Sequence, residues 1–168
     1  FFKAFRLFGY GSFVVLMVAA LLIAAVHNIF FMQTGPLLVK LGLEGSNVGP
    51  AMSIGQFTEI VMIALLGWMI KGLGMRTVLA IGGAAYFLRF LFLGTIDLPL
   101  PVIIASLGLH GVCFACFYAA AFIYVDRLAD DDIRHTVQTL FGILIGVGPV
   151  LGGWLNGKLA EMFTVNGN

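Results

Sequence analysis

The chain has 168 residues, of which 61% are hydrophobic and 10% charged, and its mean hydropathy is +1.07. Soluble globular chains are about 45 to 50% apolar and about 25% charged, so the apolar surface here exceeds what a small domain buries in its own core. The formal net charge of +1 gives no electrostatic basis for a nucleic-acid partner, which needs a clustered basic face. Two cysteines supply neither a disulfide framework nor a zinc cluster, so no metal or cofactor is expected.

Five long apolar stretches follow one another along the chain. A bilayer core about 30 Å thick requires about 20 apolar residues in a helix. The sequence therefore predicts an all-α membrane protein with spans at 12–38, 49–70, 77–95, 101–125 and 136–159. Breaks are predicted at Gly35-Pro36 together with 40–47, at 71–74 and at 97–99, and 126–134 is predicted to be a water-exposed connector.

The basic residues predict the orientation of these spans. Six of the nine fall on one side of the predicted bilayer: Lys3, Arg6, Lys71, Arg76, Arg127 and Arg134. By the positive-inside rule that side is cytoplasmic, so we expect a multi-pass protein of the cytoplasmic (inner) membrane with residue 1 inside. No cleaved signal peptide is expected, and because the chain starts without Met we expect a fragment of a longer protein.

Polar side chains within membrane spans are expected to have a structural or functional role, because lipid offers them no hydrogen-bond partners. Four of them gather before the predicted break in the first span: His27, Asn28, Gln33 and Thr34. The cluster predicts one side of a cavity, and the alternative is interhelical hydrogen bonding that only holds the bundle together.

Glu59 in the second span is the most informative of these residues. Its three-residue offset from Gln56 places both side chains on one helical face. A low-dielectric cavity disfavours the charged form of a carboxyl group, so proton binding and release near neutral pH become feasible. The alternative is a static ion pair with Arg89 of the third span, for which structural pairing is the favoured role.

The fourth span carries an aromatic and polar stripe at spacings of three and four: His110, Cys113, Phe114, Phe117 and Tyr118. Such a stripe suits a planar ligand, and it is equally an ordinary packing face. The Cys113–Cys116 pair matches C-x-x-C, but it lacks the context of a redox or zinc site.

Glycines dominate the fifth span. Three pairs have the four-residue spacing that lets helix backbones approach closely: Gly142 with Gly146, Gly148 with Gly152, and Gly153 with Gly157. We interpret them as packing positions, and Pro149 could bend this helix.

Several segments resemble those of a known transporter family. The connector 67–76 is similar to the G-x-x-x-D-R-x-G-x-[RK] loop of major facilitator transporters, with Lys71-Gly72 in place of Asp-Arg. Within that superfamily, four stretches resemble the nucleoside:proton symporters, the bacterial nucleoside permeases: 53–59 (SIGQFTE), 88–90 (LRF), 110–114 (HGVCF) and 151–162. The resemblance implies that the spans are helices seven to eleven of a twelve-helix carrier, with the N-terminal half and the last helix absent.

The same resemblance implies proton-coupled nucleoside uptake by alternating access, with no enzymatic activity and no cofactor. Asn28, Gln56 and Glu59 would bind sugar and base, Glu59 would also carry the proton, and Phe114 would pack on the base. His110, also expected to bind substrate, stands where relatives often have tyrosine. Ala115 stands where the family commonly has an aspartate.

Three other interpretations stay open. The first is a major facilitator carrier for another small polar solute, such as a sugar or a drug-like compound. The second is a membrane enzyme that uses His27 or His110 with an acidic partner, and the third is a truncated protein that does not transport. The expected partners are the lipid bilayer, the transported nucleoside and proton, and the missing N-terminal half of the carrier.

Overall fold

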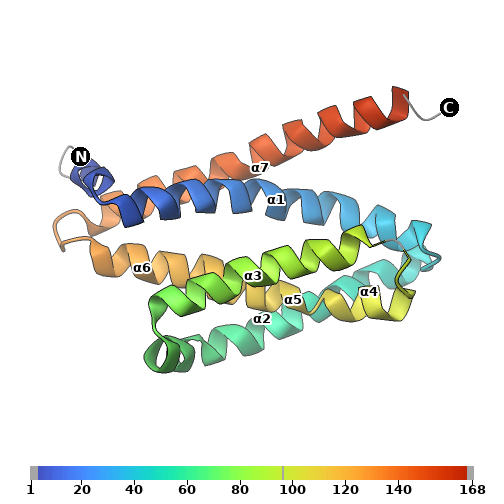
Figure 1. Ribbon diagram of the computed structural model, residues 1–168, viewed down its shortest axis with the longest axis horizontal. Helices are drawn as coiled ribbons and strands as arrows, with labels where there is room; N and C mark the ends of the chain where they lie inside the picture. Colours follow the sequence, from blue (N-terminus) through green and yellow to red (C-terminus); the bar gives the residue numbers. More distant parts are fainter. Residues whose placement is uncertain (1–3, 96, 166–168) are drawn as a thin grey trace. The chain divides into compact units, whose positions relative to one another are not determined.

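The computed structural model describes residues 4–95 and 97–165, so the expected cytoplasmic position of residue 1 and of Lys3 lies outside the described residues. A short 3-10 helix comes first, η1 (Ala4–Gly9). The helices that follow are α1 (Gly11–Lys40), α2 (Gly45–Leu73), α3 (Met75–Gly94), α4 (Leu100–Ser106), α5 (Leu109–Cys113), the π-helix η2 (Phe114–Ala119), α6 (Ala120–Leu128) and α7 (Arg134–Val165) (Figure 1).

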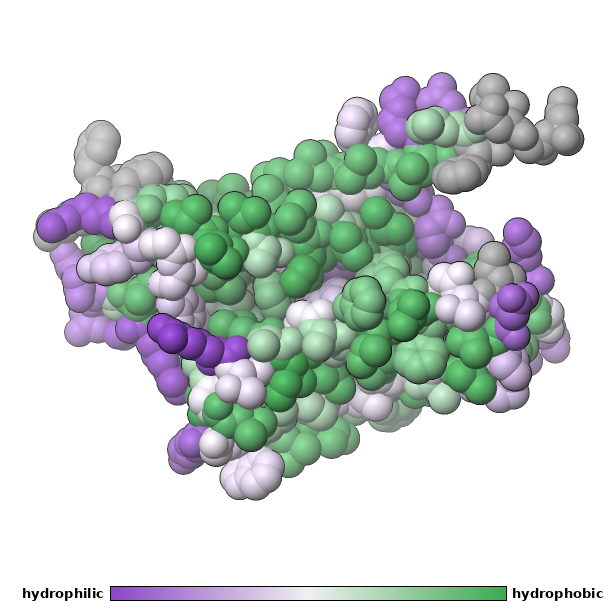
Figure 2. All heavy atoms as spheres, in the orientation of Figure 1, coloured by the Kyte–Doolittle hydropathy of each residue, from purple (hydrophilic) through white to green (hydrophobic). Residues whose placement is uncertain are grey.

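Five helical stretches in the described part are long and apolar enough to cross a membrane: α1, α2, α3, the run from α4 to α6, and α7. Within them, large side chains are widely exposed, as Phe57, Trp68 and Phe87 show with 70%, 76% and 70% of their surfaces accessible. Figure 2 shows hydrophobic residues along the helices and hydrophilic residues mainly near helix ends. The predicted all-α membrane fold with five spans is therefore confirmed, since lipid is the solvent that tolerates such side chains.

One predicted break is wrong, and another is shorter than predicted. Gly35-Pro36 lies inside α1, which continues to Lys40, because lipid-embedded helices tolerate an internal proline. The helix ends at Lys40 in a Schellman motif: Gly42 has a φ of +96°, and the backbone N–H of Leu43 donates a hydrogen bond to the Leu38 carbonyl oxygen.

The break predicted at 71–74 is a single residue. Residues 71–73 belong to α2, and Gly74 alone separates α2 from α3. Its φ of +81° and ψ of 155° lie in a region that essentially only glycine adopts. The connector predicted at 126–134 is likewise shorter, because α6 extends through Leu128.

The fourth span is not one regular helix. A turn at Leu107 and Gly108 separates α4 from α5, and the chain then passes through the π-helix η2 before α6. Short π segments inside α-helices often occur at functional sites. The sequence predicted one span at 101–125, and this internal turn was not part of that prediction.

The chain divides into two compact units, and α1 and α6 each contribute to both. The first unit contains the described residues up to Gln33 and from Val125 onward. In it α7 runs beside α1 (Figure 1), and Gly148 and Gly152 lie directly against the backbone of Ala24 and Ala25. Of the three predicted glycine pairs, this pair is the one that a neighbouring helix contacts in the described part of the chain.

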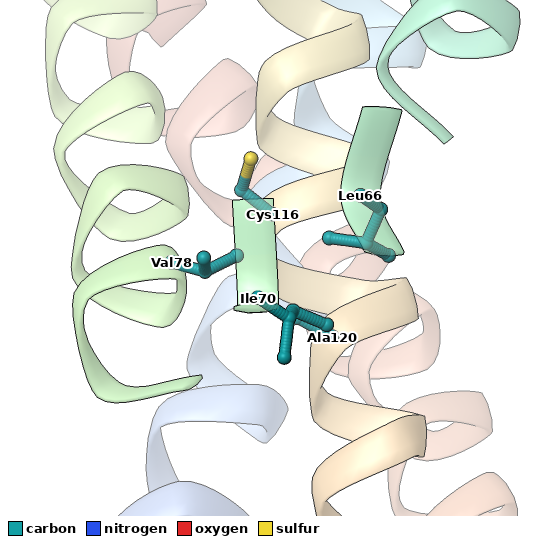
Figure 3. Close-up of a cluster of buried hydrophobic side chains, with 5 residues drawn as sticks. All are labelled: Leu66, Ile70, Val78, Cys116 and Ala120. Atoms are coloured by element: carbon teal, nitrogen blue, oxygen red, sulfur yellow. The ribbon is translucent and has the colours of Figure 1, made fainter. Parts of the chain in front are cut away.

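The second unit, Thr34–Tyr124, holds the packed core around α2, α3 and the fourth span. A buried cluster joins three of its spans: Leu66, Ile70, Val78, Cys116 and Ala120 (Figure 3). Gly82 permits this packing, because a Cβ there would lie 2.6 Å from the backbone nitrogen of Phe117. The unit thus brings α3 and η2 into backbone contact.

Candidate functional site

Glu59 is the central residue of α2, fourteen positions from each end of that helix. Its side chain is 22% exposed, so the carboxylate lies at the edge of the packed unit and not on its open surface. Gln56, one turn earlier on the same helix, is exposed. The two polar groups are therefore accessible at the midpoint of a spanning helix.

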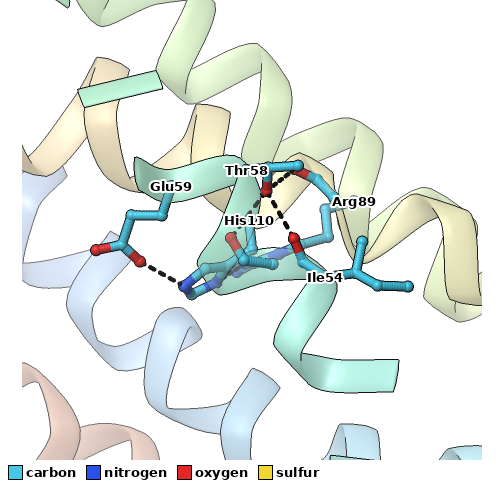
Figure 4. Close-up of polar contacts among 7 residues, drawn as sticks. Ile54, Thr58, Glu59, Arg89 and His110 are labelled. Carbon is cyan, nitrogen blue, oxygen red and sulfur yellow. Dashed lines mark hydrogen bonds and ion pairs between the residues drawn. The ribbon is translucent and has the colours of Figure 1, made fainter. Parts of the chain in front are cut away.

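A chain of polar contacts leads from Glu59 into the core of the second unit. The Oε2 atom of Glu59 lies 3.4 Å from Nε2 of His110 on α5, and Nδ1 of His110 lies 3.0 Å from Nη1 of Arg89 on α3. Arg89 is completely buried and His110 is 2% exposed. Figure 4 shows the Glu59 carboxylate directed at the imidazole ring, so His110 connects the two charged residues.

Glycines allow α2 and α5 to approach closely enough for these contacts. A Cβ on Gly111 would lie 2.6 Å from the Thr58 carbonyl oxygen, and a Cβ on Gly55 would lie 3.0 Å from the Cβ of His110. Thr58 also joins the two helices, because its hydroxyl lies 2.8 Å from the carbonyl oxygen of Gly108 (Figure 4). That carbonyl belongs to the turn between α4 and α5, where regular helical hydrogen bonding is interrupted.

The aromatic stripe of the fourth span forms in part as predicted. The Phe114 ring stacks on His110 with centroids 6.4 Å apart and lies 5.7 Å from the Tyr118 ring. On α3, the Arg89 guanidinium lies 4.8 Å from the centroid of the Tyr86 ring. Aromatic rings thus pack against the polar chain, and Phe114 is half-buried whereas Tyr86 and Tyr118 are buried.

The second unit holds four of the predicted substrate residues together on α2, α5 and η2: Gln56, Glu59, His110 and Phe114. Asn28 is half-buried on α1 in the first unit. Ala115, where a carboxylate was expected from the family pattern, has no exposed surface. Cys113 and Cys116 are buried free thiols.

Other polar residues of the first span have local partners. His27 packs edge-on against Phe31 of the same helix, and Gln33 donates a hydrogen bond of 2.5 Å to Asn156 of α7. Thr34 is buried. The interhelical bond of Gln33 matches the alternative in which polar groups hold helices together.

The Arg89–His110 contact was not predicted, although the sequence contains a signal for part of it. Glu59 and Arg89 each lie fifteen positions from Gly74, on opposite sides of it. With a one-residue turn and a rise of 1.5 Å per residue, both reach a similar depth, about 22 Å from the turn. The equal spacing places the two charges level with each other in the helical hairpin.

Comparison with known proteins identifies the family. The sequence matches the nucleoside H+ symporters over residues 1–168. The chain belongs to this family. The family consists of transporters, which are not enzymes.

Three curated relatives from Escherichia coli (strain K12) are similar to this chain. The nucleoside permease NupG is 31% identical over 69% of the chain, the putative nucleoside transporter YegT is 30% identical over 89%, and the xanthosine permease is 28% identical over 69%. The matched regions make up 29%, 36% and 29% of those proteins, so the chain spans about a third of their length. No solved structure matches it.

Proposed function

We propose that this chain forms one side of the substrate site in a proton-coupled nucleoside carrier of the major facilitator type. Its family, its five spanning helices and its match to about a third of each permease support this assignment. In the proposal the spans are helices seven to eleven of a twelve-helix carrier. The first half and the last helix belong to the rest of the same protein, and residue 1 is cytoplasmic.

Glu59 is the proposed proton carrier, and its position is the observation that carries the proposal. The carboxyl group lies at the midpoint of α2, partly exposed and backed by buried polar groups. An intramembrane carboxyl that faces a cavity is a typical site for proton binding and release. Protonation removes its charge, so the loaded carrier can reorient between the two sides of the membrane.

Substrate recognition is proposed for the accessible polar and aromatic residues around Glu59. The Gln56 amide and the Glu59 carboxylate supply donors and acceptors for sugar and base, and Phe114 offers a ring face for the base. Asn28 of α1 is proposed as a further polar ligand. Two helical halves would then rock around this midplane site to give alternating access.

Uptake of radiolabelled uridine and adenosine tests the proposal directly. Cells without their own nucleoside carriers would express the complete gene product that contains this segment, either unchanged or with Glu59→Gln. We expect nucleoside uptake that collapses with a protonophore and that is lost in Glu59→Gln, because glutamine keeps the side-chain size but cannot carry the proton.

Glu44→Gln is the matched control, since Glu44 is exposed just before α2 begins. It should leave uptake unchanged at equal membrane abundance. Protonophore-sensitive uptake that persists in Glu59→Gln would reject Glu59 as the proton carrier. Entry of sugars in place of nucleosides would favour the other-solute carrier, for which Ala115 in place of the family's aspartate is the supporting observation.

A further inference from the structure

The Arg89–His110 contact fixes which nitrogen of the His110 ring carries a proton. A guanidinium group has only N–H donors and no acceptor, so the His110 Nδ1 atom, 3.0 Å from Arg89 Nη1, must be the acceptor. A neutral imidazole with an unprotonated Nδ1 carries its hydrogen on Nε2. The geometry therefore selects one tautomer of His110.

The protonated nitrogen is the one that faces the carboxylate. His110 Nε2 lies 3.4 Å from Glu59 Oε2, the distance of a long hydrogen bond, and such contacts at functional sites often shorten when substrate binds. A second proton on the ring would place an N–H on Nδ1 opposite the N–H groups of Arg89. The contact thus opposes the imidazolium form and keeps His110 a donor toward Glu59.

Packing holds Arg89 in the position that this requires. Its guanidinium lies 4.8 Å from the Tyr86 ring centroid and 5.4 Å from that of Phe90, distances at which aromatic faces attract a cation. The side chain has no exposed surface, so it cannot reach the substrate in this conformation. The buried His110 ring lies between Arg89 and the accessible Glu59.

We infer that Arg89 is a positioning residue that holds His110 as an Nε2–H donor to Glu59, and that His110 acts on transport through Glu59. The inference rests on the proposed role of Glu59 and changes the role expected for His110, from substrate ligand to orienting partner. One Glu59 oxygen is then occupied by His110, and the remaining acceptor positions of the carboxylate face the substrate and the proton. The same logic applies to metal-bound histidines, whose second nitrogen is fixed by a neighbouring group.

Nitrogen-15 NMR of histidine-labelled complete carrier tests the tautomer, because protonated and unprotonated ring nitrogens resonate far apart. His110→Gln identifies the His110 signals by their loss. We expect an unprotonated Nδ1 and a protonated Nε2 in the unchanged protein and in Arg89→Lys, which keeps a cationic donor. In Arg89→Met, we expect Nδ1 to gain a proton.

Uptake assays on the same variants test the positioning step. We expect Arg89→Met to lower Glu59-dependent kcat/KM about tenfold or more, which corresponds to the loss of about 1.4 kcal/mol, whereas Arg89→Lys retains most activity. His110→Gln, whose amide nitrogen can replace Nε2–H, should retain more uptake than His110→Asn. His135→Gln, at an exposed histidine of α7, is the control and should behave like the unchanged protein.

Two results would overturn the inference: a protonated Nδ1 in the unchanged carrier, or an Arg89→Met protein with unaltered His110 signals and full uptake. If Arg89→Met does not reach the membrane, two measurements still test the inference: the His110 tautomer in the unchanged protein, and the uptake of His110→Gln compared with that of His110→Asn. If Glu59→Gln leaves uptake unchanged while His110 has the expected tautomer, the proposed function would be overturned instead. The positioning step would then be overturned with it, because it depends on Glu59.

Discussion

Gly111→Ala should damage both the packing and the site, because this glycine lies where α5 meets α2. The added Cβ would lie 2.6 Å from the Thr58 carbonyl oxygen, whereas ordinary contact begins at 3.4 Å. The Thr58 carbonyl carbon and the Glu59 nitrogen would lie closer still, so the helices must separate by at least about 0.8 Å, and overpacking of this kind costs about 1 to 3 kcal/mol. The clash is with backbone atoms that cannot rotate away, so its cost lies in the upper part of this range, and after alanine returns at most about 1 kcal/mol of helix propensity the net loss is about 1 to 2 kcal/mol.

A separation of that size along the contact between His110 Nε2 and Glu59 Oε2 would lengthen it from 3.4 Å to about 4.2 Å or more, beyond hydrogen-bond range. We expect Gly111→Ala to lower both the Tm of the detergent-purified complete carrier and its Glu59-dependent nucleoside uptake. Gly83→Ala is the matched control, because a Cβ there meets nothing within 4 Å. A Gly111→Ala protein with the Tm and uptake of the unchanged carrier would refute the argument.

Three further experiments test the packing within each of the two units. Gly82→Ala should also lower the Tm, because its Cβ would meet the η2 backbone, and equal Tm values for this variant and the unchanged carrier would contradict the close approach. Thr58→Val should cost about 1 kcal/mol through loss of the hydroxyl, whose one hydrogen can be donated to the carbonyl oxygen of Gly108 or of Gly55, each 2.8 Å away. Thr58→Ser keeps the hydroxyl and should retain most of the stability, as the Tm measures. A double-mutant cycle of Gln33→Leu and Asn156→Leu should give a coupling energy of about 0.6 kcal/mol. A coupling energy of zero would show that this hydrogen bond does not stabilise the protein.

The sequence predicts those parts of the fold that depend on apolar length. Five spans appear where five apolar stretches lie, because each stretch is long enough to cross the bilayer as a helix. The contacts of His110 with Phe114, and of Phe114 with Tyr118, follow from four-residue spacing along the helical stretch from α5 through η2. These features are local, so a single sequence contains the information they need.

Other features depend on packing between helices and were missed for that reason. The continuous apolar run 101–125 gives no sign of the turn at Leu107, whose neighbouring carbonyl is bound by Thr58 from another helix. The ion pair considered for Glu59 and Arg89 assumed a direct contact, whereas the structure connects them through His110. The position of the His110 imidazole between Glu59 and Arg89 depends on how three helices pack together, which residue spacing alone does not specify.

The one-residue turn at Gly74 also limits how Glu59 and Arg89 can move in the proposed transport cycle. Consecutive Cα atoms are about 3.8 Å apart, so the adjoining ends of α2 and α3 have almost no slack and cannot slide past each other. The helices can still tilt about the turn, but any shift of α2 along its axis carries α3 with it. Glu59 and Arg89 would therefore stay at matching depths in the membrane while the carrier changes the side to which it opens.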